Sequence, residues 1–253
     1  MSQGVTVIKI GTGVLTRTSD ATLDRPSLVR LVTAVAELVA SGTKCVMVSS
    51  GAVGAGVAAL GRNSYPEDVA SRQACAAIGQ CSLMHIYQTL FQNFGLQVGQ
   101  LLLTKQDLND KRRCQRVQDT LEHLLAESSV VPIINENDSV CVKELSVGDN
   151  DMLSARVSRL LGAERLILLS TIDGLDGPNG SGLVKEVHDV KDVESFARKD
   201  SGKFSIGGMA SKLKAVKYAT ESGIETIISN GRKPNLLADI VAGEPIGTRF
   251  YAR

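Results

Sequence analysis

Two clusters of acidic and amide side chains lie close together near the middle of the chain. Residues 135–138 read NEND and follow an apolar run, whereas residues 149–151 read DND and precede a segment of helical periodicity. Both clusters are therefore expected on loops at the ends of regular elements, where polar side chains can face a ligand. A helix cap or a solvated turn would explain either cluster alone, because carboxylates are favoured at helix N-termini. Two such clusters with so short a connector favour a site for a polar small molecule.

Two lysines are placed where they could bind phosphate groups. Lys9 is the penultimate residue of a predicted buried strand that runs into a GTG turn, and Lys212 lies one turn into a predicted helix that opens with a glycine pair. Backbone amides at glycine turns and helix N-termini bind anions, and a partly buried lysine needs an anionic partner. A polyphosphate is one such partner. Alternatively, Lys212 lies on a solvated helix face and Lys9 pairs with a carboxylate of residues 135–151.

These residue types together are typical of phosphoryl transfer. The chain has no GxxxxGK[ST] motif, and no GxGxxG motif followed by an acid about 20 residues later, so neither a P-loop nor a dinucleotide fold is supported. Phosphoryl transfer requires neither motif. It requires cations along the transferring group, Mg²⁺ held by a carboxylate and in-line positioning. The lysines, the glycine turns and the acids could supply these.

The elements that must position these residues alternate between strands and helices. Apolar runs predict strands at residues 5–10, 44–49, 96–103, 130–134, 165–170, 224–229 and 247–251. Periodicity and capping residues predict helices at residues 24–42, 69–94 with a break near Gly79, 114–127, 151–161, 207–222 and 234–241. This alternation predicts an α/β fold with a largely parallel central sheet.

Composition excludes several classes of partner. The chain has 253 residues, a net charge of +1, 4% aromatic residues and no Trp, which argues against nucleic-acid binding. No apolar run reaches about 18 residues, and the N-terminus enters a strand at once, so we expect no membrane span and no signal peptide. The basic residues of segment 104–116 are interpreted as a solvated loop, with a nucleic-acid patch as the alternative; they are Lys105, Lys111, Arg112, Arg113 and Arg116.

The five cysteines have an odd count and no CxxC spacing, which indicates reduced thiols in a cytoplasmic protein, with Cys45 in the core of a strand. A catalytic thiol would need a histidine and a third orienting group. The three histidines are isolated in sequence, so this alternative has little support.

Seven motifs in order carry a resemblance to a known family: VIKIGTGVLT, SSGAVGAG, NENDSV, GDNDMLSA, LLSTIDGL, GGMASKLKA and the final GTRF. The chain resembles the glutamate 5-kinases of the amino acid kinase superfamily, in the short form that lacks a C-terminal RNA-modification-type domain. The resemblance implies a three-layer sandwich in a single domain over residues 1–253, with a substrate-binding lobe at about 1–150 and a nucleotide-binding lobe at about 151–253.

The resemblance also implies an activity. Glutamate 5-kinases transfer the γ-phosphoryl group of ATP to the side-chain carboxylate of L-glutamate with the aid of Mg²⁺, in the first step of proline biosynthesis. Proline is commonly their feedback inhibitor, and they are usually cytoplasmic homo-oligomers, either dimers or tetramers. ATP, Mg²⁺, L-glutamate and proline are therefore the expected cofactors and ligands.

Carried over position by position, the family motifs assign roles to residues of this chain. The expected catalytic residues are Lys9, Lys212, Asp149 and Asp151, with Asp151 also the candidate Mg²⁺ ligand. The expected substrate-binding residues are Ser50, Gly51, Asp138 and Asn150. The expected nucleotide-binding residues are Lys9, Gly11, Ser170, Thr171, Ile206, Gly207, Gly208, Met209 and Lys212.

The chain departs from the family pattern at three places. It has a GTG turn at residues 11–13 where Gly-Ser-Ser is common, Thr171 where Asp is common, and Ile206 where Thr is common. Two alternatives follow. One is a related kinase such as acetylglutamate kinase, which the NEND and GDND motifs argue against. The other is a non-catalytic amino-acid sensor on the same fold, which Lys9 and Lys212 argue against.

Overall fold

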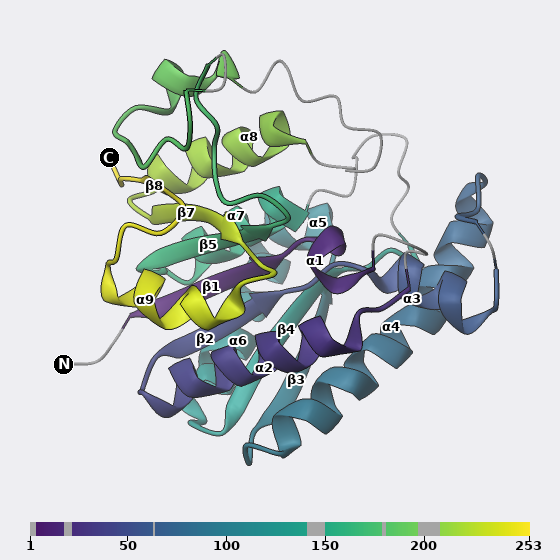
Figure 1. Ribbon diagram of the computed structural model, residues 1–253. Helices are drawn as coiled ribbons and strands as arrows, with labels where there is room; N and C mark the ends of the chain where they lie inside the picture. The colour runs from purple at the N-terminus through teal and green to yellow at the C-terminus, as the bar shows by residue number, and fades with distance from the viewer. Residues whose placement is uncertain (1–3, 18–21, 63, 141–149, 179–180, 197–207) are drawn as a thin grey trace.

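The computed structural model describes residues 4–17, 22–62, 64–140, 150–178, 181–196 and 208–253. In this part of the chain, an eight-stranded sheet has the order β3-β4-β2-β1-β5-β7-β8-β6 (Figure 1). Neighbouring strands are parallel except β7 and β8, which are antiparallel. The strands are β1 Val5–Ile10, β2 Lys44–Val48, β3 Gln97–Leu103, β4 Val130–Glu136, β5 Arg165–Ser170, β6 Glu186–Val187, β7 Glu225–Asn230 and β8 Thr248–Phe250. The predicted α/β fold with a largely parallel sheet is confirmed.

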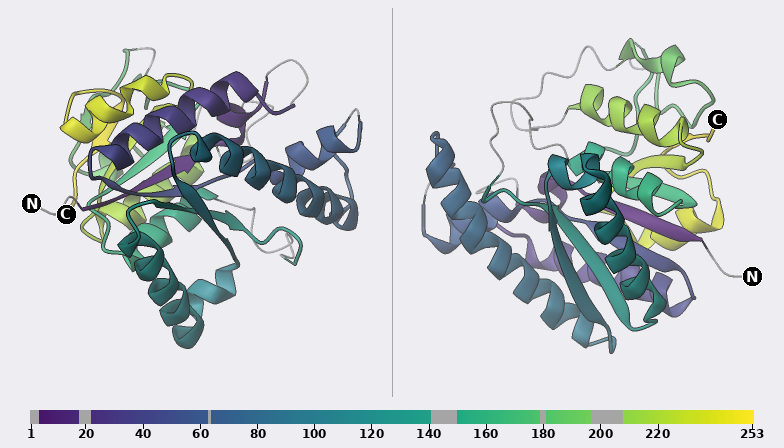
Figure 2. Two further views of the ribbon diagram at one scale, coloured as in Figure 1. Left: turned by 90° about the horizontal axis from the view of Figure 1, so that it is seen from below. Right: turned by 180° about the vertical axis from the view of Figure 1, so that it is seen from behind.

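Helices cover both faces of the sheet and make three layers (Figure 2). The α-helices are α1 Thr12–Leu15, α2 Arg25–Ala40, α3 Ala52–Ala59, α4 Val69–Gln92, α5 Lys105–Asn109, α6 Lys111–Ala126, α7 Asn150–Leu160, α8 Met209–Thr220 and α9 Leu237–Ala242. Short 3₁₀ helices occur at η2 Val190–Val193 and η4 Pro234–Leu236. Apolar side chains of α2, α4 and α9 pack on one face, and those of α6, α7 and α8 pack on the other.

Strand β1 shows how the sequence builds two cores at once. Side chains of successive residues in a strand point to opposite faces. Accordingly, Val7 belongs to the core beneath α7 and α8, while Ile8 and Ile10 belong to the core beneath α2 and α4. Lys9 therefore points to the same face as Val7, toward α7 and α8. Lys9 is only 6% exposed in this central strand, so its ammonium group must be paired.

The predicted break in α4 at Gly79 is wrong, because the helix runs unbroken from Val69 to Gln92. The glycine serves packing instead. A Cβ atom at Gly79 would lie 1.8 Å from the carbonyl oxygen of Ala52, and one at Gly56 would lie 1.8 Å from that of Cys75. Only residues without side chains allow α3 and α4 to cross at this distance.

Segment 104–116 is also helical rather than a loop. Thr104 and Asp107 form a capping box at the start of α5, and Asp110 caps α6 by accepting hydrogen bonds from two backbone amides. Polar composition concealed α5 and the first residues of α6, which was predicted only from residue 114, because capping residues and charged surface residues resemble loop composition. The five basic side chains of the segment are exposed, as predicted.

The sequence predicted reduced cysteine thiols and no membrane-spanning segment. The described cysteines are all free thiols. Cys45 is 2% exposed in β2, and burial raises the pKa of its thiol to about 12, so it is a core residue. Cys141 lies outside the described residues. No described helix is long and apolar enough to cross a membrane.

Candidate active site

The candidate site lies where neighbouring parallel strands end. The carboxyl ends of β1, β2, β4 and β5 meet at one edge of the sheet, which is where ligands bind in open α/β sheets. Lys9, Asn135 and Ser170 stand at three of these ends, and Ser49 and Ser50 follow the fourth. Helix α7 begins at the same edge with Asn150 and Asp151. The sheet order thus gathers residues that are far apart in sequence.

Three charged residues form a buried cluster, Lys9–Asp151–Lys212, at this edge. The Nζ atom of Lys9 lies 2.5 Å from Oδ1 of Asp151, and the Nζ atom of Lys212 lies 3.0 Å from Oδ2. The side chains of Lys9, Asp151 and Lys212 are 7%, 2% and 10% exposed. Each comes from a different element: β1, α7 and α8. The cluster therefore exists only when these three elements are packed together.

The protonation state of Asp151 follows from its surroundings. Burial by itself raises the pKa of this carboxyl group, but the charges of Lys9 and then Lys212, together with their hydrogen bonds, outweigh burial and lower the pKa. The position of Asp151 in the first turn of α7 also favours the ionised form. One carboxylate between two ammonium groups leaves the cluster with one positive charge, which suits an anionic ligand.

Side-chain amides form a second network beside this cluster. The Nδ2 atom of Asn150 lies 3.0 Å from the carbonyl oxygen of Ser49, 2.9 Å from Oγ of Ser50 and 3.1 Å from Oδ1 of Asn135. By contrast, Oδ1 of Asn150 is buried and has no hydrogen-bond partner among the described residues. A buried acceptor without a donor is costly, so a ligand that supplies an N–H or O–H group would satisfy it.

The orientation of the Asn150 amide is set by the backbone. The Ser49 carbonyl oxygen can only accept hydrogen bonds, so it must face the amide nitrogen of Asn150 rather than its oxygen. Rotating the amide by half a turn would place two acceptors against each other. The oxygen of Asn150 is consequently the atom left for a ligand.

Helices α3 and α8 begin with glycines that leave backbone amides available. Gly51 precedes α3 with a φ of 93°, and Gly208 precedes α8; neither helix start has a side-chain cap. The first amides of a helix lack partners within the helix and attract anions. A Cβ atom at Gly11 would lie 3.2 Å from the carbonyl oxygen of Leu169, a tight contact, and 3.7 Å from Nζ of Lys9.

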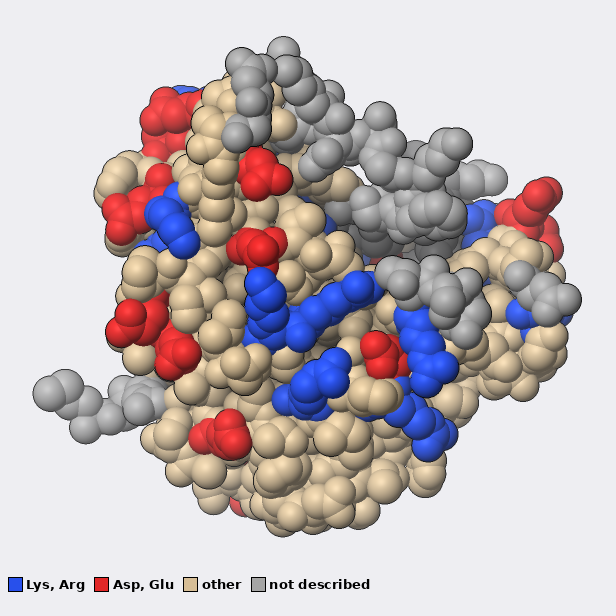
Figure 3. All heavy atoms as spheres, in the orientation of Figure 1, with Lys and Arg blue, Asp and Glu red and all other residues tan. Residues whose placement is uncertain are grey.

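A further polar group lies at the ends of β5 and β7. Oδ1 of Asp173 accepts hydrogen bonds from Nδ2 of Asn230 at 3.0 Å and from Nζ of Lys233 at 2.8 Å. These hydrogen bonds, that of Lys233 first, lower the pKa of Asp173. Nη2 of Arg232 donates to the carbonyl oxygen of Gly13 at 3.2 Å. Figure 3 shows basic side chains gathered on this face of the molecule.

Sequence reasoning did not single out Asp173, Asn230, Arg232 or Lys233 as site candidates. The available signal was the turn NGRKP at the end of β7, which follows a buried strand just as the NEND cluster does.

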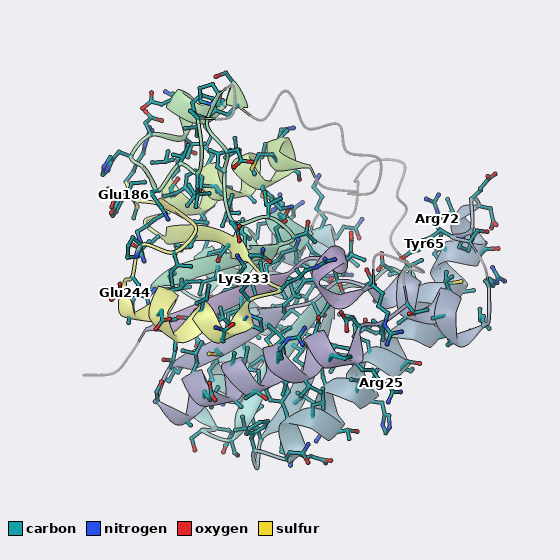
Figure 4. All side chains as sticks on the ribbon, viewed as in Figure 1. Arg25, Tyr65, Arg72, Glu186, Lys233 and Glu244 are labelled. Carbon is teal, nitrogen blue, oxygen red and sulfur yellow. The ribbon has the colours of Figure 1, made fainter. Side chains whose placement is uncertain are left out.

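In Figure 4, Lys233 lies near the sheet, whereas Tyr65 and Arg72 lie on an arm formed by α3 and the start of α4.

The structure brings five of the predicted residues together in two adjoining groups. Lys9, Asp151 and Lys212 form one group, Ser50 and Asn150 form the other, and Asn150 directly precedes Asp151 in the chain. Asp138 lies in the turn after β4 and is half-buried. The backbones of Ser170 and Gly231 are joined by a hydrogen bond of 2.8 Å, Thr171 is exposed, and Met209 packs in the core beside α7. Asp149, Ile206 and Gly207 lie outside the described residues. The functional roles of all these residues remain predictions.

Asp151, the candidate ligand of Mg²⁺, is poorly placed to hold a metal ion in this structure. Among them, no group of three or more His, Cys, Asp or Glu could hold a metal. Both carboxylate oxygens of Asp151, the candidate ligand, are paired with lysines. A cation on Asp151 would have to displace an ammonium group and would be repelled by the other. The role of Asp151 as a metal ligand thus remains a prediction that this geometry does not favour.

Comparisons with known proteins identify the family to which the chain belongs. Residues 4–230 match the amino acid kinase family. The chain is 42% identical to a glutamate 5-kinase of Salmonella paratyphi B over 254 residues, which covers 98% of this chain and 68% of that protein.

Two solved structures resemble the fold. One is a carbamate kinase of Giardia lamblia bound to AMP-PNP, with a TM-score of 0.68, 16% identity and full coverage of both chains. The other is an N-acetylglutamate synthase of Neisseria gonorrhoeae, with a TM-score of 0.72 and 16% identity, covering 100% of this chain and 60% of that one. These likenesses show a shared fold, and the sequence relatives confirm the resemblance that the motifs indicated.

Proposed function

Because the chain belongs to the glutamate 5-kinases of the amino acid kinase family, we propose that it transfers the γ-phosphoryl group of ATP to the side-chain carboxylate of L-glutamate. The products are ADP and L-glutamyl 5-phosphate, and the reaction is the first step of proline biosynthesis. The observation that supports this most strongly is the buried Lys9–Asp151–Lys212 cluster.

The cluster suits phosphoryl transfer better than proton transfer. The attacking carboxylate is already ionised at neutral pH, so the reaction needs no general base. It needs positive charge where the transferring phosphoryl group spreads its negative charge. Lys9 and Lys212 supply that charge from a site almost closed to water, and Asp151 holds both ammonium groups in place before the substrates arrive.

The amide network suits an amino-acid substrate. The Oδ1 atom of Asn150, which has no hydrogen-bond partner among the described residues, can accept a hydrogen bond from the ammonium group of glutamate. Asp138, in the turn after β4, is proposed as an ionic partner of the same ammonium group, and Ser50 and Gly51 as further contacts. Asp149 is proposed to help organise the site.

The nucleotide is proposed to bind along β5 and α8. The residues assigned to it are Lys9, Gly11, Ser170, Thr171, Ile206, Gly207, Gly208, Met209 and Lys212. The uncapped amides after Gly208 favour phosphate oxygens. We propose Mg²⁺ as a companion of ATP, but no step is assigned to it because both carboxylate oxygens of Asp151 are already paired with lysines. Proline as inhibitor, assembly as a dimer or tetramer, and the division into lobes near residue 150 are proposed from the resemblance alone.

The test measures ADP release with Mg²⁺–ATP in the presence and absence of L-glutamate, with hydroxylamine to trap the acyl phosphate. We expect glutamate-dependent release and a hydroxamate product, lost on chelation of Mg²⁺ and reduced by proline. N-acetylglutamate and carbamate serve as control acceptors and should give little turnover. Binding of glutamate by calorimetry without ADP release would instead indicate a non-catalytic sensor, and preference for another acceptor would indicate a related kinase.

A further inference from the structure

Helix α4 reaches the substrate side of the site through one buried polar residue. Gln80 is 8% exposed, and its Oε1 atom accepts a hydrogen bond of 2.9 Å from Nδ2 of Asn135. Asn135 is 1% exposed and stands at the end of β4. Its Oδ1 atom in turn accepts the hydrogen bond from Asn150. The three amides thus form a chain, Gln80–Asn135–Asn150, that leads from α4 to the proposed glutamate site.

Backbone groups fix which amide donates and which accepts in this chain of hydrogen bonds, both at Asn135 and at Asn150. The amide nitrogen of Glu136 donates to Oδ1 of Asn135 at 2.9 Å, so that atom of Asn135 must be an oxygen. The Nδ2 atom of Asn135 must then face Gln80. At the other end, the carbonyl oxygen of Ser49 orients Asn150. Only a hydrogen-bond acceptor at position 80 completes this arrangement.

Packing holds Gln80 at a constant distance from the site. Gly79, the preceding residue, contacts the backbone of Ala52 in α3 so closely that no side chain would fit there. About two helical turns further along the same face, the hydroxyl group of Tyr87 lies 3.0 Å from Oγ of Ser49, the residue whose carbonyl oxygen orients Asn150. Helix α4 therefore contacts both the start of α3 and the loop between β2 and α3.

We propose that Gln80 is a positioning residue for the amino-acid substrate: by accepting the hydrogen bond of Asn135, it holds the amide that, together with the carbonyl oxygen of Ser49, orients Asn150 toward glutamate. The inference rests on the proposed function, because it assigns Asn150 to glutamate. Gln80 has no described contact with Lys9, Asp151 or Lys212. Its loss should accordingly weaken glutamate binding and leave the phosphoryl-transfer step nearly intact.

The experiment compares Gln80→Met with Gln80→Glu. Methionine has a similar size but no comparable acceptor, so Asn135 loses its partner; we expect the KM for glutamate to rise about tenfold, the equivalent of one hydrogen bond, with kcat and the KM for ATP changed less than about threefold. The variant Gln80→Glu keeps an acceptor oxygen on its side chain in either protonation state and should restore most of the affinity for the substrate glutamate. Calorimetry with L-glutamate alone should show the same pattern.

Gln88→Met is the matched control. Gln88 lies on the same helix and hydrogen-bonds Gln97 and the backbone of Val98, away from the amide chain. It should alter thermal unfolding without changing the KM for glutamate. If the wild-type enzyme phosphorylates glutamate but Gln80→Met raises the KM for glutamate no more than Gln88→Met does, the inference is overturned and the proposed function stands. A wild-type protein without glutamate-dependent turnover would refute the proposed function, and the inference would fall with it.

A second measurement guards against a general loss of structure. Asn135→Leu should also raise the KM for glutamate, and Gln80→Met combined with it should add little, because both changes break the same chain. Additive effects of the two substitutions would show that Gln80 acts by another route and would contradict the proposal.

Discussion

Two aspartates at the carboxyl edge of the same sheet are paired with lysines in opposite surroundings. The side chain of Asp151 is 2% exposed and lies between Lys9 and Lys212. The side chain of Asp173 is 59% exposed and pairs with Lys233, which is 54% exposed. Both aspartates have lowered pKa values, but burial opposes the shift at Asp151 and contributes little at Asp173.

The difference shows which ionic contact has consequences for the molecule. An exposed pair is solvated whether or not it forms, and salt screens it, so it contributes little to stability. A buried cluster loses solvation that its own attraction hardly offsets, and removing one partner leaves a charge without compensation. The buried cluster is thus better explained by the chemistry it prepares than by stability, and four predictions test the contrast.

Asp151→Asn should have the largest effect. It removes the carboxylate that two buried ammonium groups share, and we expect the free energy of unfolding to fall by about 3–5 kcal/mol. The lysines would lose their common anchor, so kcat should fall by about 10³ or more, as for other preorganised charged groups. Urea unfolding and steady-state kinetics measure the two effects. Near wild-type values in both would refute the role of the cluster.

Lys212→Ala should have the next largest effect. It removes a charge that acts mainly in the transition state, so kcat should fall by about 10²–10³ while the KM for glutamate changes little. Lys214→Ala, on the same helix, is the control, since that side chain is exposed. A KM effect larger than the kcat effect would place Lys212 in ground-state substrate binding instead.

The response of stability to acid should separate the wild type from Asp151→Asn. The pKa of Asp151 is lower in the folded than in the unfolded protein, where it is about 3.9, so its contribution is fully present above about pH 4 and is lost as pH falls through the folded pKa. The stability difference between the two proteins should be constant from neutral pH down to about pH 5 and shrink below pH 4. A difference that stays constant in acid would contradict this.

Asp173→Asn should have the smallest effect on stability. The carboxylate is exposed, so the free energy of unfolding should change by about 0.5 kcal/mol or less, and less again in high salt. Chemical denaturation at two ionic strengths measures it. A loss comparable to that of Asp151→Asn would erase the contrast between the two ionic contacts.

Some parts of the fold were predictable because their signals are local. The bounds of β1 and β5 were predicted to the residue, since each is an apolar run that ends at a polar turn. The start of α2 was predictable from Asp24 and Pro26, which act within one turn of chain. In contrast, α3 has four small residues among its first five and forms against α4, which no local pattern reveals.

The candidate site divides in the same way. The sequence by itself determined which residue types were available: two lysines beside glycine turns, two acid–amide clusters and an order of motifs that identifies the family. Only the tertiary structure decided their partners. Lys9 and Lys212 share Asp151, the carbonyl oxygen of Ser49 turns the Asn150 oxygen toward the site, and Gln80 of α4 supports Asn135. The partners in these contacts lie 55 to 142 positions apart in the chain. Such contacts depend on the order of strands in the sheet and on helix packing, and nothing near each residue in the chain encodes its distant partner.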